Sequence, residues 1–432
     1  MKMKLPLPKP PVRQPIKKQN IEQLNKKLAQ LSAQFRQATA QKDYEAARKH
    51  VAEVLKYVPD HVVAMMDLAF TELRLERYED AYRHYLKAIS LSKAKVDTNI
   101  YDGLTEVCYQ LDKPDEVQKY GALALQSKKN QVNEQSTLNI PAERPVFNPT
   151  RPQENIIAFS LFGSDPRYCE TAWLNVVHAR EIYPEWTCRI YLDDSVPDAV
   201  QQRLKNAGAQ TIMVNEQQKQ LSGLFWRFLV MDDPDVRFFM IRDADSLISY
   251  REKAAVQAWL DSSRWFHSMR DFYSHTELIL AGMWGGCHGV FHGIETMIQQ
   301  YMQTGNYLTS RVVDQHFLRY MIWPALKQSL ISHDSQGFDP DAVPFPEAVQ
   351  QTDYEQAETF HVGSNMGAPV MIVKVEDAAA ETVRWVLLDQ ENQEVCSYEA
   401  AVLDSREIMV NLPRIYTDNI QKKIWRIELY SV

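Results

Sequence analysis

The chain has 432 residues, of which 45% are hydrophobic and 24% charged, and its formal net charge is −8. This balance is typical of a globular protein with two or three domains, and it argues against a general nucleic-acid binder, which is usually basic. Five cysteines, without a CxxC pair, predict reduced thiols in a cytoplasmic protein rather than a disulfide framework. No apolar run reaches 18 residues, so we expect no transmembrane segment.

The first 18 residues carry six basic residues, five prolines and no acidic residue. They lack the apolar core of a secretory signal. We interpret residues 1–19 as a disordered basic arm. A weak tether to an anionic membrane surface is the alternative, because clustered Lys and Arg favour such binding, and it would place the protein peripherally at the inner membrane face.

Residues 20–127 have a helical pattern and contain an internal repeat. DYEAA at 43–47 aligns with RYEDA at 77–81, so that Ala47 and Ala81 stand 34 positions apart, and a poorer third copy follows. This resembles tetratricopeptide repeats, stacked helix hairpins in which a small residue lets two helices approach closely. The Trp and Gly of that repeat are missing here. Two roles remain open: a surface for a protein partner or self-association, and a structural extension of the neighbouring domain.

A proline-containing linker is expected at 128–154, followed by alternating strands and helices. Strands are predicted at 156–162, 188–192, 211–214 and 238–241, and helices at 169–183 and 198–207. This alternation predicts a parallel α/β sheet over 155–369. Five short β-type runs after Pro369 predict a β-rich accessory region over 370–432; they lie at 370–375, 383–388, 395–402, 408–412 and 424–430.

Two carboxylates, Asp243 and Asp245, follow the fourth predicted strand. Open α/β sheets place their ligands at the carboxyl ends of the strands. Mn²⁺ or Mg²⁺ held by one or two carboxylates and completed by substrate phosphates suits this position. A polar turn after a strand is the alternative.

A β-α-β-α-β start followed by Asp-x-Asp resembles a GT-A glycosyltransferase, a Rossmann-like fold that uses Mn²⁺ or Mg²⁺ to hold a nucleotide-diphosphate sugar. The lipopolysaccharide galactosyl- and glucosyltransferase type is the closer resemblance. Its further elements match Trp226-Arg227, Asp314-Gln315 and His361 with Gly363. The chain departs from that type in two places. That type has a lysine before the last proline, whereas Gly367 and Ala368 precede Pro369 here. Arg242 and Ser246 flank the aspartates, where that type often has apolar residues.

The resemblance implies a role for each matching residue. Asp243, Asp245 and His361 would be the metal ligands, with His333 as the competing third ligand. Asp314 and Gln315 would face the reacting sugar as catalytic residues. Phe162 and Gly163 would lie under the base and ribose, and Arg227 would face the diphosphate.

Other candidates come from the sequence between the motif and the next glycines. Asp271 and Arg270 are expected to bind donor-sugar hydroxyls, His275 to reach the acceptor, and Arg242 to contact the donor nucleotide. Five of only 14 glycines fall between Gly282 and Gly293, which predicts a close approach of ligand to backbone; a tight turn is the alternative.

The predicted function is a metal-dependent hexosyltransferase, with a retaining outcome slightly favoured, that acts on a glycan, lipid-linked or protein acceptor, as in polysaccharide biosynthesis. One rival is an inactive helical-repeat scaffold. The other is a Mg²⁺-dependent phosphohydrolase of the haloacid-dehalogenase type, which also uses Asp-x-Asp after a strand. That type begins its domain with the motif, whereas three predicted strands precede it here.

Overall fold

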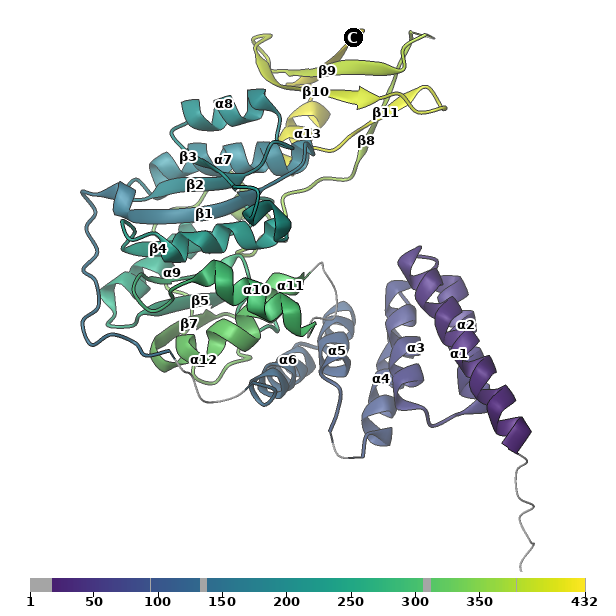
Figure 1. Cartoon of the computed structure of the whole chain (residues 1–432). Helices are drawn as coiled ribbons and strands as arrows, with labels where there is room; N and C mark the ends of the chain where they lie inside the picture. Colours follow the sequence, from purple (N-terminus) through teal and green to yellow (C-terminus); the bar gives the residue numbers. More distant parts are fainter. Residues whose placement is uncertain (1–17, 94, 133–137, 306–311, 378, 432) are drawn as a thin grey trace, which may run out of the picture. The chain divides into compact units, whose positions relative to one another are not determined.

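A computed structural model describes residues 18–93, 95–132, 138–305, 312–377 and 379–431 (Figure 1). The chain divides into two compact units, residues 1–120 and 121–432. Nearly all of the basic arm expected at 1–19, and residues 133–137 of the expected linker, lie outside the described part. None of the described helices is both long and apolar enough to cross a membrane.

The first unit consists of helical hairpins. The helices α2 (Tyr44–Tyr57) and α4 (Tyr78–Leu91) begin 34 residues apart, which confirms the repeat seen in the sequence. A left-handed residue closes the turn within each hairpin: Lys42 and Glu76, and then Asp112 in the third copy. The remaining helices are α1 (Lys18–Ala40), α3 (Val62–Arg74), α5 (Thr98–Gln110) and α6 (Pro114–Lys129), the last of which crosses the division between the units.

The small residues of the repeat lie where helices pack closely. Ala47 and Ala81 are fully buried, as expected for the crossing positions. Capping fixes where the helices begin, since the Asp43 carboxylate accepts the Ala46 N–H at 2.9 Å ahead of α2. Leu31, Val51, Val54, Ala64 and Leu68 form a core that joins the first three helices.

The second unit contains a seven-stranded mixed sheet with the strand order β3-β2-β1-β4-β6-β5-β7. Its first four strands are parallel, as predicted, and the aspartate motif follows the fourth. The sheet is not parallel throughout, because β6 runs antiparallel to both of its neighbours. The strands are β1 (Asn155–Leu161), β2 (Thr187–Leu192), β3 (Gln210–Met213), β4 (Phe238–Arg242), β5 (Phe266–Arg270), β6 (Met283–Cys287) and β7 (Leu330–Asp334).

Helices connect these strands and cover the sheet (Figure 1). Two of the predicted helices are found within three residues of their expected starts, α7 (Pro166–Ile182) and α8 (Asp198–Asn206). The apolar segment around Arg227 is a 3₁₀ helix, η3 (Gly223–Asp232). The other described helices of the sheet region are α9 (Tyr250–Asp261), α10 (Ile294–Thr304), α11 (Val313–Phe317) and α12 (Trp323–Leu326).

Two of the clustered glycines allow neighbouring strands to pack closely, whereas we expected the cluster to allow a ligand to approach the backbone. Gly285 and Gly286 lie within β6, between β4 and β5. A Cβ at Gly285 would stand 2.6 Å from the Phe239 carbonyl oxygen, and one at Gly286 would meet the Phe266 ring. The central antiparallel strand therefore fits only without side chains at these positions.

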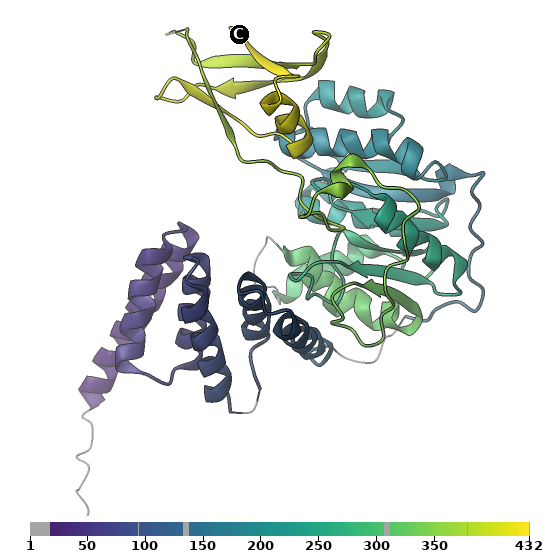
Figure 2. The ribbon, with the colours of Figure 1, turned by 180° about the vertical axis from the view of Figure 1, so that it is seen from behind.

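The C-terminal region is β-rich, as predicted, but also contains a helix, α13 (Arg414–Gln421), that the sequence did not suggest. Its strands form a three-stranded sheet, β10-β9-β12, and a two-stranded sheet, β11-β8. They are β8 (Met371–Lys374), β9 (Thr382–Leu388), β10 (Glu394–Ala401), β11 (Glu407–Val410) and β12 (Arg426–Ser431). In Figure 2 the coil that follows β7 crosses the α/β unit and joins these strands.

A buried carboxylate anchors this region to the sheet domain. Glu170 of α7 is fully buried and accepts two hydrogen bonds from Arg203, at 2.7 and 2.9 Å. It also accepts the hydroxyls of Tyr398 and Tyr416 from the C-terminal region. The accessory region is therefore packed onto α7 and α8 as part of one unit.

Candidate functional site

The candidate site lies where β1 and β4 end. These two parallel strands are neighbours, so Phe162 and Gly163 follow one strand beside Asp243 and Asp245, which follow the other. The fully buried residues of β4 fix the position at which the two carboxylates leave the sheet. The topology thus brings together the ends of the first and fourth strands.

Arg227 links the motif to a distant carboxylate. Its guanidinium donates to the Asp243 carboxylate, to the Asp314 carboxylate at 2.9 Å and to the Arg242 carbonyl oxygen at 3.0 Å. Burial opposes its charge, but Asp243 and then Asp314 outweigh this and raise the pKa of Arg227. Burial raises the pKa of Asp314. Three residues that are far apart in sequence therefore form one charged cluster.

Asp245 is held from the opposite side by Asn365, whose side-chain amide donates to its carboxylate. The Met366 N–H donates to the Asp245 carbonyl oxygen at 2.8 Å, and Ser246 pairs with Asn365 across an isolated bridge. Burial, followed by repulsion from Asp243, raises the pKa of Asp245 to about 6. Two close carboxylates with this like-charge repulsion form a place where a cation is favoured.

Asn365 was not among the predicted site residues. Its side-chain oxygen accepts the Gly367 N–H at 2.7 Å while its nitrogen bonds Asp245. The only signal in the sequence was its position, four residues after His361 in the loop that the resemblance had singled out.

His361 lies on this loop and stacks on Phe272, with ring centroids 3.8 Å apart and an interplanar angle of 1°. Its Nδ1 is 3.1 Å from the Thr359 carbonyl oxygen, and burial lowers its pKa. The neighbouring Val362 N–H donates to Asp271 at 2.9 Å. A ring that is neutral and donates through Nδ1 presents Nε2 as an acceptor.

The predicted set of three metal ligands is not assembled. Among the described residues, no three His, Cys, Asp or Glu side chains are grouped closely enough to hold a metal ion. His361 therefore does not complete a three-residue site with Asp243 and Asp245 in this arrangement. The competing ligand His333 is fully buried in β7, which β6 and β5 separate from β4, so it does not lie beside the aspartates.

Phe162 and Gly163 form an accessible edge of the site. Phe162 is 45% exposed, and its ring lies edge-on to Trp226 with centroids 5.7 Å apart. Gly163 has a φ of 77°, which favours glycine, and its N–H donates to the Ser195 hydroxyl at 2.6 Å. An exposed aromatic ring next to a bare backbone suits contact with a flat ligand group.

Several other predicted binding residues have structural partners instead. Arg242 is buried and donates to Glu252 at 3.1 Å and to the Trp284 carbonyl oxygen. Arg270 is also buried and donates to the carbonyl oxygens of His275 and Glu277. We therefore correct the expectation that these two arginines are available to the donor, because their guanidinium groups are used inside the domain.

The predicted roles of Asp271 and His275 also need correction. Asp271 receives two hydrogen bonds from Arg251, at 2.9 and 2.7 Å, and fixes the Val362 backbone. Nδ1 of His275 accepts the Asp271 N–H, and burial lowers the pKa of His275 to about 3. These contacts hold the His361 loop in place, and Arg251 and the Val362 N–H occupy the Asp271 carboxylate.

The last predicted residues lie at the edges of the cluster. A Cβ at Gly282 would overlap the Asp243 carboxylate, so this glycine makes room for the motif itself. Gln315 is half-buried in α11, directly after Asp314, and its N–H donates to the Asp314 carboxylate at 2.9 Å. Asp314 is the second residue of α11 and not its cap, which is Val312.

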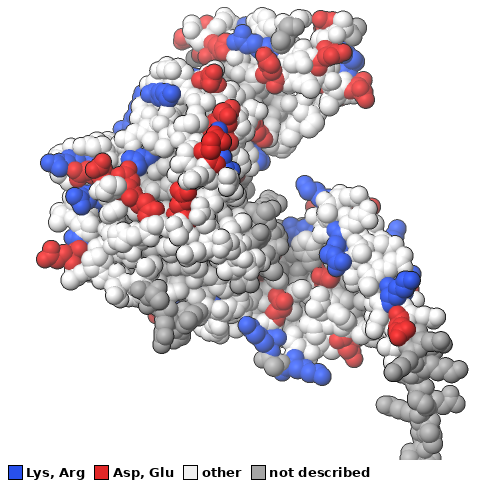
Figure 3. Space-filling view, viewed as in Figure 1, with Lys and Arg blue, Asp and Glu red and all other residues white. Residues whose placement is uncertain are grey.

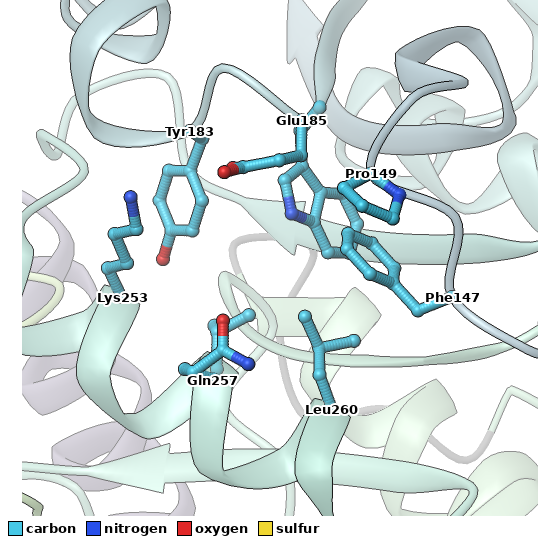
Figure 4. A pocket seen from close by; sticks show the side chains of 9 residues that line it. Phe147, Pro149, Tyr183, Glu185, Lys253, Gln257 and Leu260 are labelled. Atoms are coloured by element: carbon cyan, nitrogen blue, oxygen red, sulfur yellow. The ribbon is translucent and has the colours of Figure 1, made fainter.

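A separate cavity of about 190 Å³ lies away from the aspartates (Figure 4). Trp186 and Glu185 directly precede β2, and Phe147 lies ahead of β1, so the cavity is at the amino-terminal end of the parallel strands. Glu185, together with Lys253 and Gln257 of α9, adds polar groups to a wall that is otherwise mainly aromatic and aliphatic. None of the predicted site residues lines it.

Charged side chains on the molecular surface are mixed in sign. Figure 3 shows Lys and Arg interspersed with Asp and Glu over the C-terminal strands. Acidic and basic side chains are therefore mixed on this face and do not form separate patches.

Comparisons with known proteins support the repeat unit. Residues 38–101 match the family model of the tetratricopeptide repeat. No curated protein matches the chain. An O-GlcNAc transferase mutant from Thermobaculum terrenum is similar at 14% identity over 51% of this chain and 46% of that chain, with a TM-score of 0.26. The match thus covers less than half of that protein, and a likeness at this TM-score carries no argument about fold or function.

Tetratricopeptide-like repeats are thus followed by an α/β region with a mixed sheet.

Proposed function

We propose that the α/β unit is a metal-dependent glycosyltransferase of the GT-A type, which transfers a sugar from a nucleotide-diphosphate donor. One observation carries this proposal: Asp243 and Asp245 leave the carboxyl end of a central strand beside the exposed Phe162 ring and the Arg227 cation. A polar turn without function would not need a buried arginine that joins the motif to Asp314. Three strands precede the motif, unlike in the phosphohydrolase alternative.

The carboxylate pair fits a hard divalent cation. Arg227 uses one oxygen of Asp243, and Asn365 uses one oxygen of Asp245, so each carboxylate keeps a second oxygen. Oxygen ligands from two carboxylates, with phosphate and water at the remaining positions, suit Mn²⁺ or Mg²⁺. When bound, the ion would offset the charge that develops on the departing nucleoside diphosphate. His361 would join these ligands only after its loop shifted.

The remaining residues bind and orient the donor. Phe162 would stack against the base, and the bare backbone of Gly163 would allow the ribose to approach. Gln315 would border the sugar next to Asp314, whose carboxylate is kept fixed by its buried ion pair with Arg227. Preorganised charges of this kind reduce the cost of reorganisation during reaction.

Hydrolysis of donors tests the proposal. Purified protein would be incubated with a panel of nucleotide-sugars, with Mn²⁺, with Mg²⁺ and with chelator, and release of the nucleoside diphosphate would be measured. We expect slow, metal-dependent release from one donor, reduced on the order of 100-fold in Asp245→Asn. Absence of release from every donor with either metal would contradict the proposal.

We further propose that the repeat unit binds a protein partner or a second copy of the chain. The match to the tetratricopeptide repeat over residues 38–101 supports this, since stacked repeats create extended binding surfaces. If the α/β unit fails the donor test, this binding role becomes the principal function. Light scattering of the full chain at increasing concentration would detect self-association.

A further inference from the structure

Arg167 is a cation at the carboxyl end of β1 that the site described above does not yet use. It is the second residue of α7, two positions after the helix cap Asp165. Basic side chains are unfavourable in the first turn of a helix, because the positive end of the helix dipole lies there. The helix dipole therefore gives no reason for a cation at this position, where the guanidinium packs on the Tyr168 ring at 4.5 Å from its centroid.

The guanidinium lies beside the loop that holds Asp245. A Cβ at Gly367 would stand 2.5 Å from Arg167 Cδ and 3.2 Å from its Nη1, so the arginine fills the space of the absent side chain. Gly367 in turn donates to Asn365, which donates to Asp245. Arg167, Gly367, Asn365 and Asp245 are thus contiguous.

Donor groups of Arg167 remain to be satisfied. Nη2 donates to the Tyr168 hydroxyl at 2.6 Å, and Nε is buried without a hydrogen-bond partner among the described residues. Nη1, which lies beside Gly367, is therefore the donor atom left for a ligand. A planar cation with unused donors next to a carboxylate pair is suited to phosphate.

We propose that Arg167 binds the diphosphate of the donor nucleotide through Nη1, beside Gly367 and the loop that holds Asp245. This inference rests on the proposed function. It assigns the phosphate contact to α7. Arg227, which is committed to Asp243 and Asp314, then acts mainly on the carboxylates.

Binding of nucleotides that differ by one phosphate tests this role. Uridine, guanosine and cytidine diphosphates and their monophosphates would be titrated calorimetrically in Mn²⁺ into the full chain. For the best nucleotide, we expect Arg167→Gln to weaken diphosphate binding about tenfold or more and monophosphate binding less than about twofold. Arg167→Lys should lose less than Arg167→Gln.

A second variant acts without removing the cation. Gly367→Ala should displace the guanidinium and lower diphosphate affinity in the same direction, which keeps the test decisive if Arg167→Gln does not fold. Unchanged diphosphate affinity in both variants would overturn the inference, as would equal losses for mono- and diphosphate, which would indicate a purely structural role. If the unaltered protein binds no nucleoside diphosphate, the proposed function itself has failed.

Discussion

At the scale of single residues, Arg227 is the group on which the charges of the candidate site depend. Its side chain is 4% exposed, and that of Asp314 is 5% exposed, so neither charge is hydrated in the folded protein. Asp243, at 40%, is partly open to water. A buried cation shared by two carboxylates stabilises them mainly by preventing an unpaired charge in the interior.

Replacement of Arg227 should therefore be costly. Arg227→Met leaves the Asp314 carboxylate buried without its cation, and we expect the free energy of unfolding to fall by about 3–5 kcal/mol. Arg384→Met is the matched control, because the Arg384–Glu394 pair is about half exposed on both sides and should cost about 0–1 kcal/mol. Urea unfolding measures both; equal effects would contradict the assigned role of Arg227.

Two buried histidines should make stability depend on pH. Neither ring nitrogen of His267 or of His333 has a hydrogen-bond partner among the described residues. Burial lowers the pKa of His333 to about 4, and burial, then Arg242 and His333, lowers that of His267 well below its usual value. Below pH 6.5 the unfolded chain binds protons that the folded chain excludes, so stability falls as pH decreases from about 6.5 toward 4.

The slope should reach about 1.4 kcal/mol per pH unit for each of these histidines. Urea unfolding between pH 7 and pH 4.5 measures it. His333→Leu should reduce the slope. A slope that is the same in the protein and in His333→Leu would show that His333 does not titrate in this range.

At the scale of elements, the antiparallel strand β6 depends on glycine. Gly285→Ala would bring a Cβ within 2.6 Å of the Phe239 carbonyl oxygen, a backbone atom that cannot rotate away. We expect a loss of about 1–3 kcal/mol and a lower unfolding midpoint. Gly208→Ala, where no atom lies within 4 Å but φ is 95°, reports the cost of backbone strain alone. A smaller effect at Gly285 than at Gly208 would contradict this account of β6.

The elements also show what local sequence predicts well. The hairpin repeat, the first four strands and the position of the aspartates were predicted, because each has a strong local pattern of apolar and small residues. The direction of β6 was not, since Met283–Cys287 has no feature that distinguishes a parallel from an antiparallel neighbour. The helix α13 was missed because its polar sequence follows directly after a strand-like run.

The candidate site was predicted at the ends of β1 and β4 and, through the resemblance, at Arg227, Asp314 and Gln315. Arg242 and Arg270 were assigned to the donor because the sequence does not show whether an arginine near carboxylates binds a ligand or a protein group. In the structure Arg242 donates to Glu252, and Arg270 donates to the Glu277 carbonyl oxygen. Asn365 and Arg167 were missed because their importance arises from contacts across the domain.

At the scale of the whole molecule, different observations support the interpretation of each unit. The repeat unit is supported by its period, its turns and a family match. In the second unit, the site draws on β1, η3, β4, α11 and the loop that carries His361, and the C-terminal region is fixed to α7 through Glu170. The central claim is that this arrangement holds a nucleoside diphosphate through a divalent cation.

Calorimetric titration of nucleoside diphosphates tests this claim most directly. Uridine, guanosine and cytidine diphosphates would be added with and without Mn²⁺ to the unaltered protein, to Asp245→Asn and to the control Asp261→Asn, which lies at the end of α9. We predict that one nucleotide binds only with Mn²⁺, that Asp245→Asn abolishes this binding and that Asp261→Asn retains it. Absence of binding under every condition, or binding that is indifferent to both Mn²⁺ and Asp245→Asn, would contradict the account.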